Sequence, residues 1–168
     1  MKFQQLLKKF SERLDIMDIL EFRIMTAGTS GEHWADSDRL RQIPVVKIFI
    51  NHKDFREIVK PIELPFTLLE EDPDTAEEWA GEYGCIPAEE LYHELLRYPE
   101  EVSLFTCPAC GESGCWSVVC TVTETENSVI WNAFRHNHRD WNYPLTYQFS
   151  KQNYFTELEK IAKAYQKI

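Results

Sequence analysis

Three short segments rich in β-branched and aromatic side chains follow one another in the second half of the sequence, at 102–105, 116–123 and 128–134. Turn-forming residues separate them, and 124–127 has the composition of a hairpin connection. This succession is typical of an antiparallel meander, in which strands adjacent in sequence pair with each other. The C-terminal half is therefore predicted to contain an antiparallel sheet.

The first half of the sequence mixes helical and strand patterns. Residues 2–15 place apolar side chains at spacings of three and four, which predicts an amphipathic helix. Residues 44–50, PVVKIFI, are apolar and β-branched, which predicts a buried strand, and 19–25 predicts another. The stretch 26–38 is rich in Gly, Ser, Thr and Asp and is predicted to be a loop.

A capping pattern and two prolines mark the segment after the buried strand. Asp54, with Glu57 three residues later, has the spacing of a capping box and predicts a short helix over 55–59. Pro61 and Pro65 predict an extended segment beyond it, because proline is excluded from helix interiors.

Two further helices complete the prediction. Pro87 suits the first position of a helix over 88–97, and Ser150 can cap a last helix that begins after it. The fold class is therefore α+β, with an antiparallel sheet packed with N-terminal, middle and C-terminal helices. The length of 168 residues, of which 43% are hydrophobic, fits a single domain over 1–168.

The charge of the chain restricts its partners. Twenty-eight acidic against 18 basic side chains give a net charge of −10, a field that repels nucleic acid and anionic membrane surfaces. Residues 70–82 hold seven carboxylates without Lys or Arg, which predicts a solvated loop or short helix, with a metal or cationic-partner site as the alternative. Residues 1–10 lack the apolar stretch of a signal peptide, so we expect a cytoplasmic protein.

The five cysteines are an odd set, for which a disulfide framework is not expected in a reducing compartment. Cys107 and Cys110 form a Cys-x-x-Cys pair around a tight turn, which can present two thiolates to one tetrahedral ion, and Cys115 adds a third. If 116–123 is a strand, Cys120 lies roughly 16 Å from Cys115 and on the opposite face. Cys120 and Cys85 are therefore predicted to be core thiols.

A closed zinc site needs a fourth ligand, for which the sequence offers His138 or His136. The metal site is accordingly predicted to comprise Cys107, Cys110, Cys115 and His138. Two alternatives stay open for the turn. It can be reduced and metal-free, with Gly111 and Gly114 present for their backbone conformation, or it can support redox chemistry, although it precedes strands rather than a helix.

The segment 132–143 mixes imidazole, guanidinium and carboxylate groups with large aromatic rings. Such a segment can bind an anionic or aromatic ligand, and His138 oriented by Asp140 could act as an acid or base. The alternative is a connection whose rings pack on the core. The predicted ligand or partner surface comprises Arg135, His138, Arg139, Asp140 and Trp141. No catalytic residue is predicted, because no nucleophile, phosphate-binding or metalloprotease motif occurs.

Several segments together resemble an uncharacterised bacterial protein family, from about residue 44 onwards. The matching segments are Val45-Val46-x-Ile48-Phe49-Ile50-Asn51, Ile62-Glu63-Leu64-Pro65-Phe66, Cys110-Gly111-x-x-Gly114-Cys115-Trp116, and Trp131 with Phe134, His138, Arg139 and Trp141. In that family the turn usually reads Cys-x-Cys-Gly-x-x-Gly-Cys-Trp, so Cys107 is displaced by one position. The family has no established activity, so the resemblance implies a single domain and no reaction.

Together these observations favour a non-enzymatic protein-interaction domain, for instance of the immunity type, whose acidic surface covers a basic surface on another protein. A small structural-zinc protein is the first alternative. A thiol-dependent enzyme or redox protein is the second.

Overall fold

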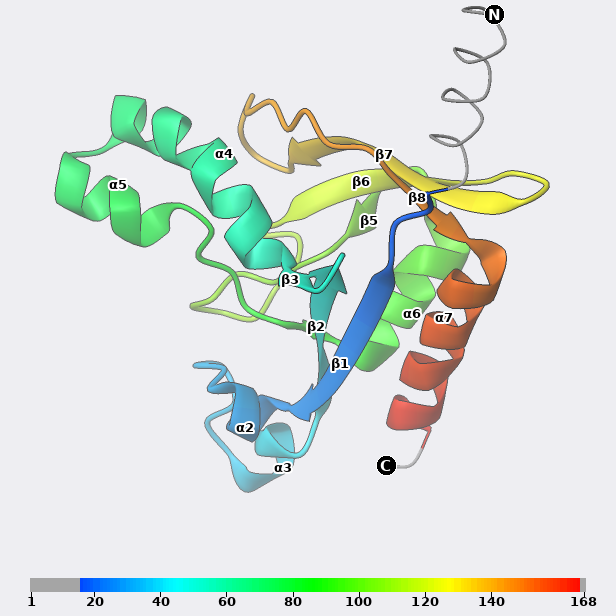
Figure 1. Cartoon of the computed structure of the whole chain (residues 1–168). Helices are drawn as coiled ribbons and strands as arrows, with labels where there is room; N and C mark the ends of the chain where they lie inside the picture. Colours follow the sequence, from blue (N-terminus) through cyan, green and yellow to red (C-terminus); the bar gives the residue numbers. More distant parts are fainter. Residues whose placement is uncertain (1–15, 167–168) are drawn as a thin grey trace, which may run out of the picture.

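The computed structural model describes residues 16–166, and these form an α+β fold with two antiparallel sheets (Figure 1). The predicted fold class is therefore confirmed. The helix predicted over 2–15 lies outside the described residues. None of the helices between residues 16 and 166 has both the length and the apolar stretch that crossing a bilayer requires.

The first sheet is built on the two strands predicted in the N-terminal half. β1 (Leu20–Thr26) pairs antiparallel with β2 (Pro44–Ile50) over its whole length. Every residue of β2 except Lys47 is buried, as the apolar pattern of this strand predicts. Two short strands, β3 (Lys53–Asp54) and β4 (Ile86–Pro87), add to β2, and neither was predicted.

The second sheet has the strand order β5-β6-β7-β8 and confirms the predicted meander. Its strands are β5 (Val102–Ser103), β6 (Val118–Glu124), β7 (Ser128–His136) and β8 (Tyr147–Ser150). β8 was not predicted, and β7 extends two residues beyond the predicted strand. Residues 125–127 connect β6 and β7, as the hairpin prediction requires.

β7 contains a bulge that changes which of its side chains face the core. Val119 pairs with Arg135 but Thr121 pairs with Asn132, so one residue of β6, Cys120, faces two of β7. Ala133, one of these two, has a φ of 51°. The extra residue shifts the strand's alternation by one. As a result Phe134 and His136 are buried, like Trp131 before the bulge.

Two long helices lie on the same side of the first sheet in Figure 1. They are α6 (Ala88–Arg97), predicted with these bounds, and α7 (Lys151–Tyr165). Ser150 accepts a hydrogen bond from the Asn153 N–H, which confirms it as the cap of α7. Leu91 of α6 and Ile161 of α7 have no exposed surface, and both belong to the core cluster that also contains residues of both sheets.

The helix after β3 is much longer than predicted. α4 (Phe55–Glu70) continues through Pro61 and Pro65, so the prediction of a short helix followed by an extended segment is wrong. Both prolines are exposed, where water can bond the carbonyls that lose an N–H partner. The opposite face of α4 buries four residues at intervals of four, Phe55, Val59, Glu63 and Thr67. Burial of this stripe stabilises the helix despite the prolines.

The prediction of a loop over 26–38 is also wrong in part. α2 (Ala27–Ser30) begins where the Thr26 hydroxyl accepts a hydrogen bond from the Thr29 N–H. It ends at Gly31, whose φ of 78° is readily adopted only by glycine. A second short helix, α3 (Asp38–Arg41), is capped by Ser37. These local capping bonds form helical turns in a sequence whose composition is typical of loops.

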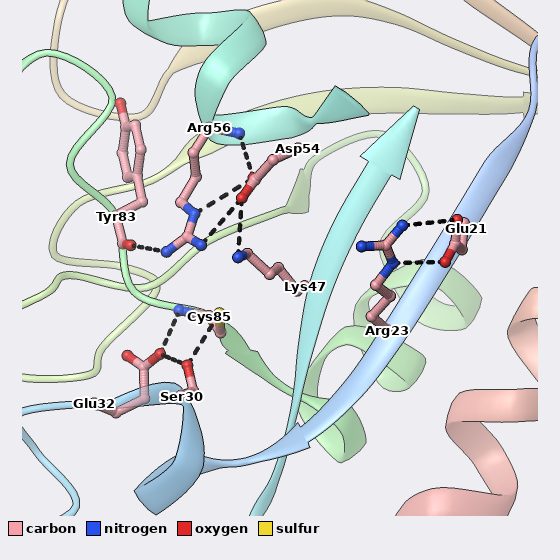
Figure 2. Close-up of polar contacts among 9 residues, drawn as sticks. All are labelled: Glu21, Arg23, Ser30, Glu32, Lys47, Asp54, Arg56, Tyr83 and Cys85. Atoms are coloured by element: carbon pink, nitrogen blue, oxygen red, sulfur yellow. Dashed lines mark hydrogen bonds and ion pairs between the residues drawn. The ribbon is translucent and has the colours of Figure 1, made fainter. Parts of the chain in front are cut away.

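The start of α4 is fixed by a cluster of charges between the first sheet and the helix (Figure 2). Asp54 caps the helix by accepting from the Arg56 N–H, and its carboxylate also pairs with Lys47 and Arg56, each at 3.2 Å. Arg56 also donates to the Tyr83 carbonyl at 3.4 Å. The segment between α5 (Pro73–Trp79) and β4 is thereby tied to the beginning of α4.

Candidate functional site

The connection between β5 and β6 brings three cysteines together. Cys107, Cys110 and Cys115 each offer a sulfur, and these atoms all lie within 4.8 Å of one another. None of the three forms a disulfide. Tetrahedral coordination with Zn–S bonds of about 2.3 Å would separate sulfurs by about 3.8 Å. This cysteine triad could therefore hold a metal ion.

Backbone hydrogen bonds fold residues 107–115, the cysteine turn, so that the sulfurs converge. The Gly111 N–H donates to the Cys107 carbonyl at 2.9 Å, and the Cys107 N–H donates to the Glu112 carbonyl at 3.0 Å. The Cys115 N–H donates to the same Glu112 carbonyl at 3.3 Å. The turn therefore needs no distant element to bring its first and last cysteines together.

The environment of the triad favours a thiolate at Cys107. Burial alone would raise the pKa of this thiol, but hydrogen bonds from the backbone N–H groups of Cys110 and Ala109 and from the two neighbouring thiols lower it below its ordinary value. Hydrogen bonding to Cys107 and Cys110 raises the pKa of Cys115 to about 11. Because thiolates are the metal-binding form, Cys107 is the natural first ligand.

Gly111 combines a left-handed backbone conformation with a close contact to the Trp34 ring. Its φ is 79°, and an added Cβ would lie 2.6 Å from two atoms of the Trp34 ring. Gly111→Ala is expected to lower the free energy of unfolding by about 1–3 kcal/mol, because it adds strain in a left-handed conformation. Gly114→Ala is the matched control, since nothing lies within 4 Å of its added Cβ. Equal denaturation midpoints for the two variants would contradict this role of Gly111.

Residues after β7 hold the cysteine turn from the side. The Asn137 side chain donates to the Ser113 carbonyl at 3.1 Å and accepts from the Ser117 N–H at 3.0 Å. His138 lies 2.6 Å from the Gly114 carbonyl through Nε2, which must donate because a carbonyl only accepts. No sequence pattern singles out Asn137, because its side chain bonds residues that are about 20 positions away in the sequence.

The candidate fourth ligand His138 lies beside the triad rather than in it. Within the described residues the metal-ligand group contains only the three cysteines. To coordinate a metal, His138 must release Gly114 or use its other nitrogen, Nδ1. Its role as a ligand stays a prediction.

His136, the other candidate ligand, is buried under two tryptophans. Its ring centroid lies 4.0 Å from that of Trp116 and 4.9 Å from that of Trp141. Burial, with the nearby Arg139 and His138 side chains, lowers the pKa of His136 to about 4, so the His136 ring is neutral at pH 7. Its Nδ1 accepts from the His138 N–H at 3.0 Å, which leaves the ring proton on Nε2. His136 therefore supports the tryptophans and positions His138.

The two cysteines outside the triad are buried, as predicted. Cys120 has no exposed surface and lies in the core cluster with Val118, and Trp116 and Val122 pack against this cluster. Cys85 is buried near Ser30, whose hydroxyl lies 3.4 Å from its sulfur (Figure 2). Neither belongs to the metal-ligand group.

Beside the triad lies a cavity of about 320 Å³, which we call the tryptophan cavity. Trp79, Trp116 and Trp141 line it, and Cys107 and Cys115 contribute part of its wall. The Trp116 ring meets those of Trp79 and Trp141 at steep angles, with centroids 6.1 Å and 5.8 Å away. The cysteine turn therefore forms one side of a largely aromatic cavity.

No protein-family model, curated protein or solved structure matches this chain. The resemblance to an uncharacterised bacterial family accordingly stays a prediction.

The structure brings together only part of the predicted ligand or partner surface. Arg139 and Trp141 both line the tryptophan cavity, and both donate to Glu70 at the end of α4. Arg135 instead pairs with Glu101 at 3.3 Å. No hydrogen bond joins His138 to Asp140 within residues 16–166, so the geometry provides no support for an acid–base pair.

Proposed function

We propose that the protein binds one structural zinc ion through Cys107, Cys110 and Cys115, with His138 as the fourth ligand once it releases the Gly114 carbonyl. The observation that carries the proposal is the convergence of three sulfurs within 4.8 Å in a turn whose own hydrogen bonds set their positions. Thiolate ligands around a short turn are typical of structural zinc sites. Zinc would fix the cysteine turn, and with it one wall of the tryptophan cavity.

The test is elemental analysis of untagged protein purified without chelators, with thiols counted by alkylation before and after unfolding. About one zinc per chain is expected. All five thiols should resist alkylation in the folded protein, three through the metal and two, Cys85 and Cys120, through burial. A chelator should then expose three thiols and leave two protected.

Protein without zinc, in which Cys107 reacts rapidly near neutral pH, would overturn the zinc proposal. It would instead favour the thiol-dependent alternative, because rapid alkylation requires an accessible thiolate.

We also propose an interaction role, in which the acidic surface receives a basic surface of another cytoplasmic protein. The observation that favours it is a groove of about 900 Å³ lined by Asp74, Glu77, Glu78 and Glu82, with Lys60 as the one cation among the described residues that line it. Opposite charges steer such partners together and select against others. The same charges argue against nucleic acid and anionic membranes as partners.

A further inference from the structure

The acidic groove and the tryptophan cavity adjoin each other. Trp79 and Pro108 line both hollows, so the end of α5 and the beginning of the cysteine turn form their shared border. Trp79 is 47% exposed, so part of its side chain is accessible to a ligand. A molecule lying in the groove would therefore meet the Trp79 ring at the entrance to the cavity.

The lining of the two hollows carries an uncompensated negative charge. Among residues 16–166, six carboxylates line them, against two cations, Lys60 and Arg139, of which Arg139 already pairs with Glu70. The other five carboxylates have no ion-pair partner in the part of the chain that the structure describes; they are Glu71, Asp74, Glu77, Glu78 and Glu82. A cationic occupant would neutralise charges that the described fold leaves unpaired.

The cavity already binds one guanidinium from the chain itself. The Arg139 guanidinium carbon lies 5.1 Å from the centroid of the Trp116 ring, and Arg139 Nε lies 3.2 Å from a Glu70 oxygen. Trp141 Nε1 donates to the other Glu70 oxygen at 3.1 Å, which fixes the carboxylate. A cation held between an indole face and a carboxylate is a favourable arrangement. Trp79 and Glu71 also line the cavity, and neither contacts a cation in an ion pair or a cation–π contact among residues 16–166.

We propose that the groove and the cavity together bind a basic polypeptide segment, with one of its arginine or lysine side chains placed against Trp79 in the tryptophan cavity. This inference rests on the interaction role proposed above and names its recognition site. An acidic peptide or a phosphate-bearing ligand would be repelled by the carboxylates that line the groove. An uncharged apolar segment would fill the cavity but leave the charges of the groove unpaired.

The five indole N–H groups of the protein allow a direct test by NMR with ¹⁵N-labelled protein. The probe is a capped octapeptide of alternating arginine and glycine, and its control has glutamate in place of arginine. The arginine peptide is expected to shift the indole signals of Trp79, Trp116 and Trp141. The signal of Trp131, which has no exposed surface, should stay in place and reports that the fold is intact.

Variants then separate the groove from the cavity. Glu77→Gln/Glu78→Gln is expected to weaken binding several-fold. The same charge change at Glu100→Gln/Glu126→Gln, two exposed carboxylates that line neither hollow, should have little effect. Trp79→Leu keeps an apolar side chain but removes the indole face, and is expected to weaken binding roughly three- to thirty-fold.

The possible failures are distinguishable. Binding that depends on Glu77 and Glu78 but not on Trp79 would overturn the cavity as the recognition site and leave the interaction role standing. No binding of the arginine peptide, or equal binding of the glutamate peptide, would overturn both. Neither result affects the zinc proposal, because zinc content is measured independently.

Discussion

Replacing Cys110 with serine is expected to reduce bound zinc from about one ion per chain to nearly none. A serine hydroxyl does not ionise near neutral pH, so the triad loses one of its three anionic ligands. A ligand that binds only the folded state at a thousand times its Kd adds about 4 kcal/mol to the free energy of unfolding. The variant should therefore be destabilised by about that amount, measured by denaturant unfolding of the zinc-loaded wild type and the variant.

Cys120→Ala is the matched control for this substitution. It also removes a thiol, but from a fully buried position outside the metal-ligand group, so zinc content should stay at the wild-type value. Its stability should fall by about 1 kcal/mol through the small cavity created. Full zinc content in Cys110→Ser, or equal stability of wild type with and without chelator, would contradict a structural zinc.

Replacing Glu63 with alanine is expected to destabilise the protein by about 3 kcal/mol or more. The Glu63 carboxyl has no exposed surface and accepts hydrogen bonds from the Tyr83 and Tyr143 hydroxyls, at 2.5 Å and 2.6 Å. It also accepts from the Gly81 N–H at 2.7 Å. Alanine would leave at least two buried donors unpaired, each at a cost of about 1–3 kcal/mol. Denaturant unfolding measures the change.

The pH dependence of the free energy of unfolding tests whether the pKa of Glu63 is raised in the folded protein. Burial raises the pKa of Glu63 above its ordinary value of 4.5, against the lowering effect of its three hydrogen bonds. The folded state then holds the proton more tightly than the unfolded state. The stabilisation that this tighter proton binding provides is fully present below pH 4.5 and is lost as the pH rises through the pKa of Glu63 in the folded protein. Glu63→Gln, which does not titrate, should lack this decline. Parallel pH profiles would refute the pKa shift.

Elements of the fold that have strong local signals could be predicted from the sequence. The apolar run of β2 and the cap at Ser150 needed only neighbouring residues. α4 could not be predicted, because the cost of Pro61 and Pro65 is visible in the sequence whereas the benefit of burying the opposite face is not. Tertiary packing decided that segment, against its local propensity.

Only one part of the candidate site, the cysteine triad, could be predicted from the sequence, and the tryptophan cavity could not. The cysteine triad lies within nine residues, so the sequence alone indicated that its thiols could share a metal ion. The tryptophan cavity draws Trp79, Trp116 and Trp141 from three separate segments, and only the fold brings them together. The carboxylates of residues 70–82 were visible as a charged run, but their position beside an aromatic cavity was not.

The bulge at Ala133 determines which residues of β7 face the core, and among them is His136, which packs against Trp116 and Trp141 of the tryptophan cavity. This arrangement therefore depends on the number of residues in the strand as well as on their side chains. Before the bulge, odd-numbered residues such as Trp131 face inward; after it, even-numbered residues such as His136 do. Deletion or insertion of one residue at the bulge would exchange the inward-facing and outward-facing residues after it, turning Arg135 inward and His136 outward. Substitutions that accept a positive φ, such as Ala133→Gly or Ala133→Asn, preserve this parity. This stretch of β7 should therefore accept changes of side chain far more readily than changes of length.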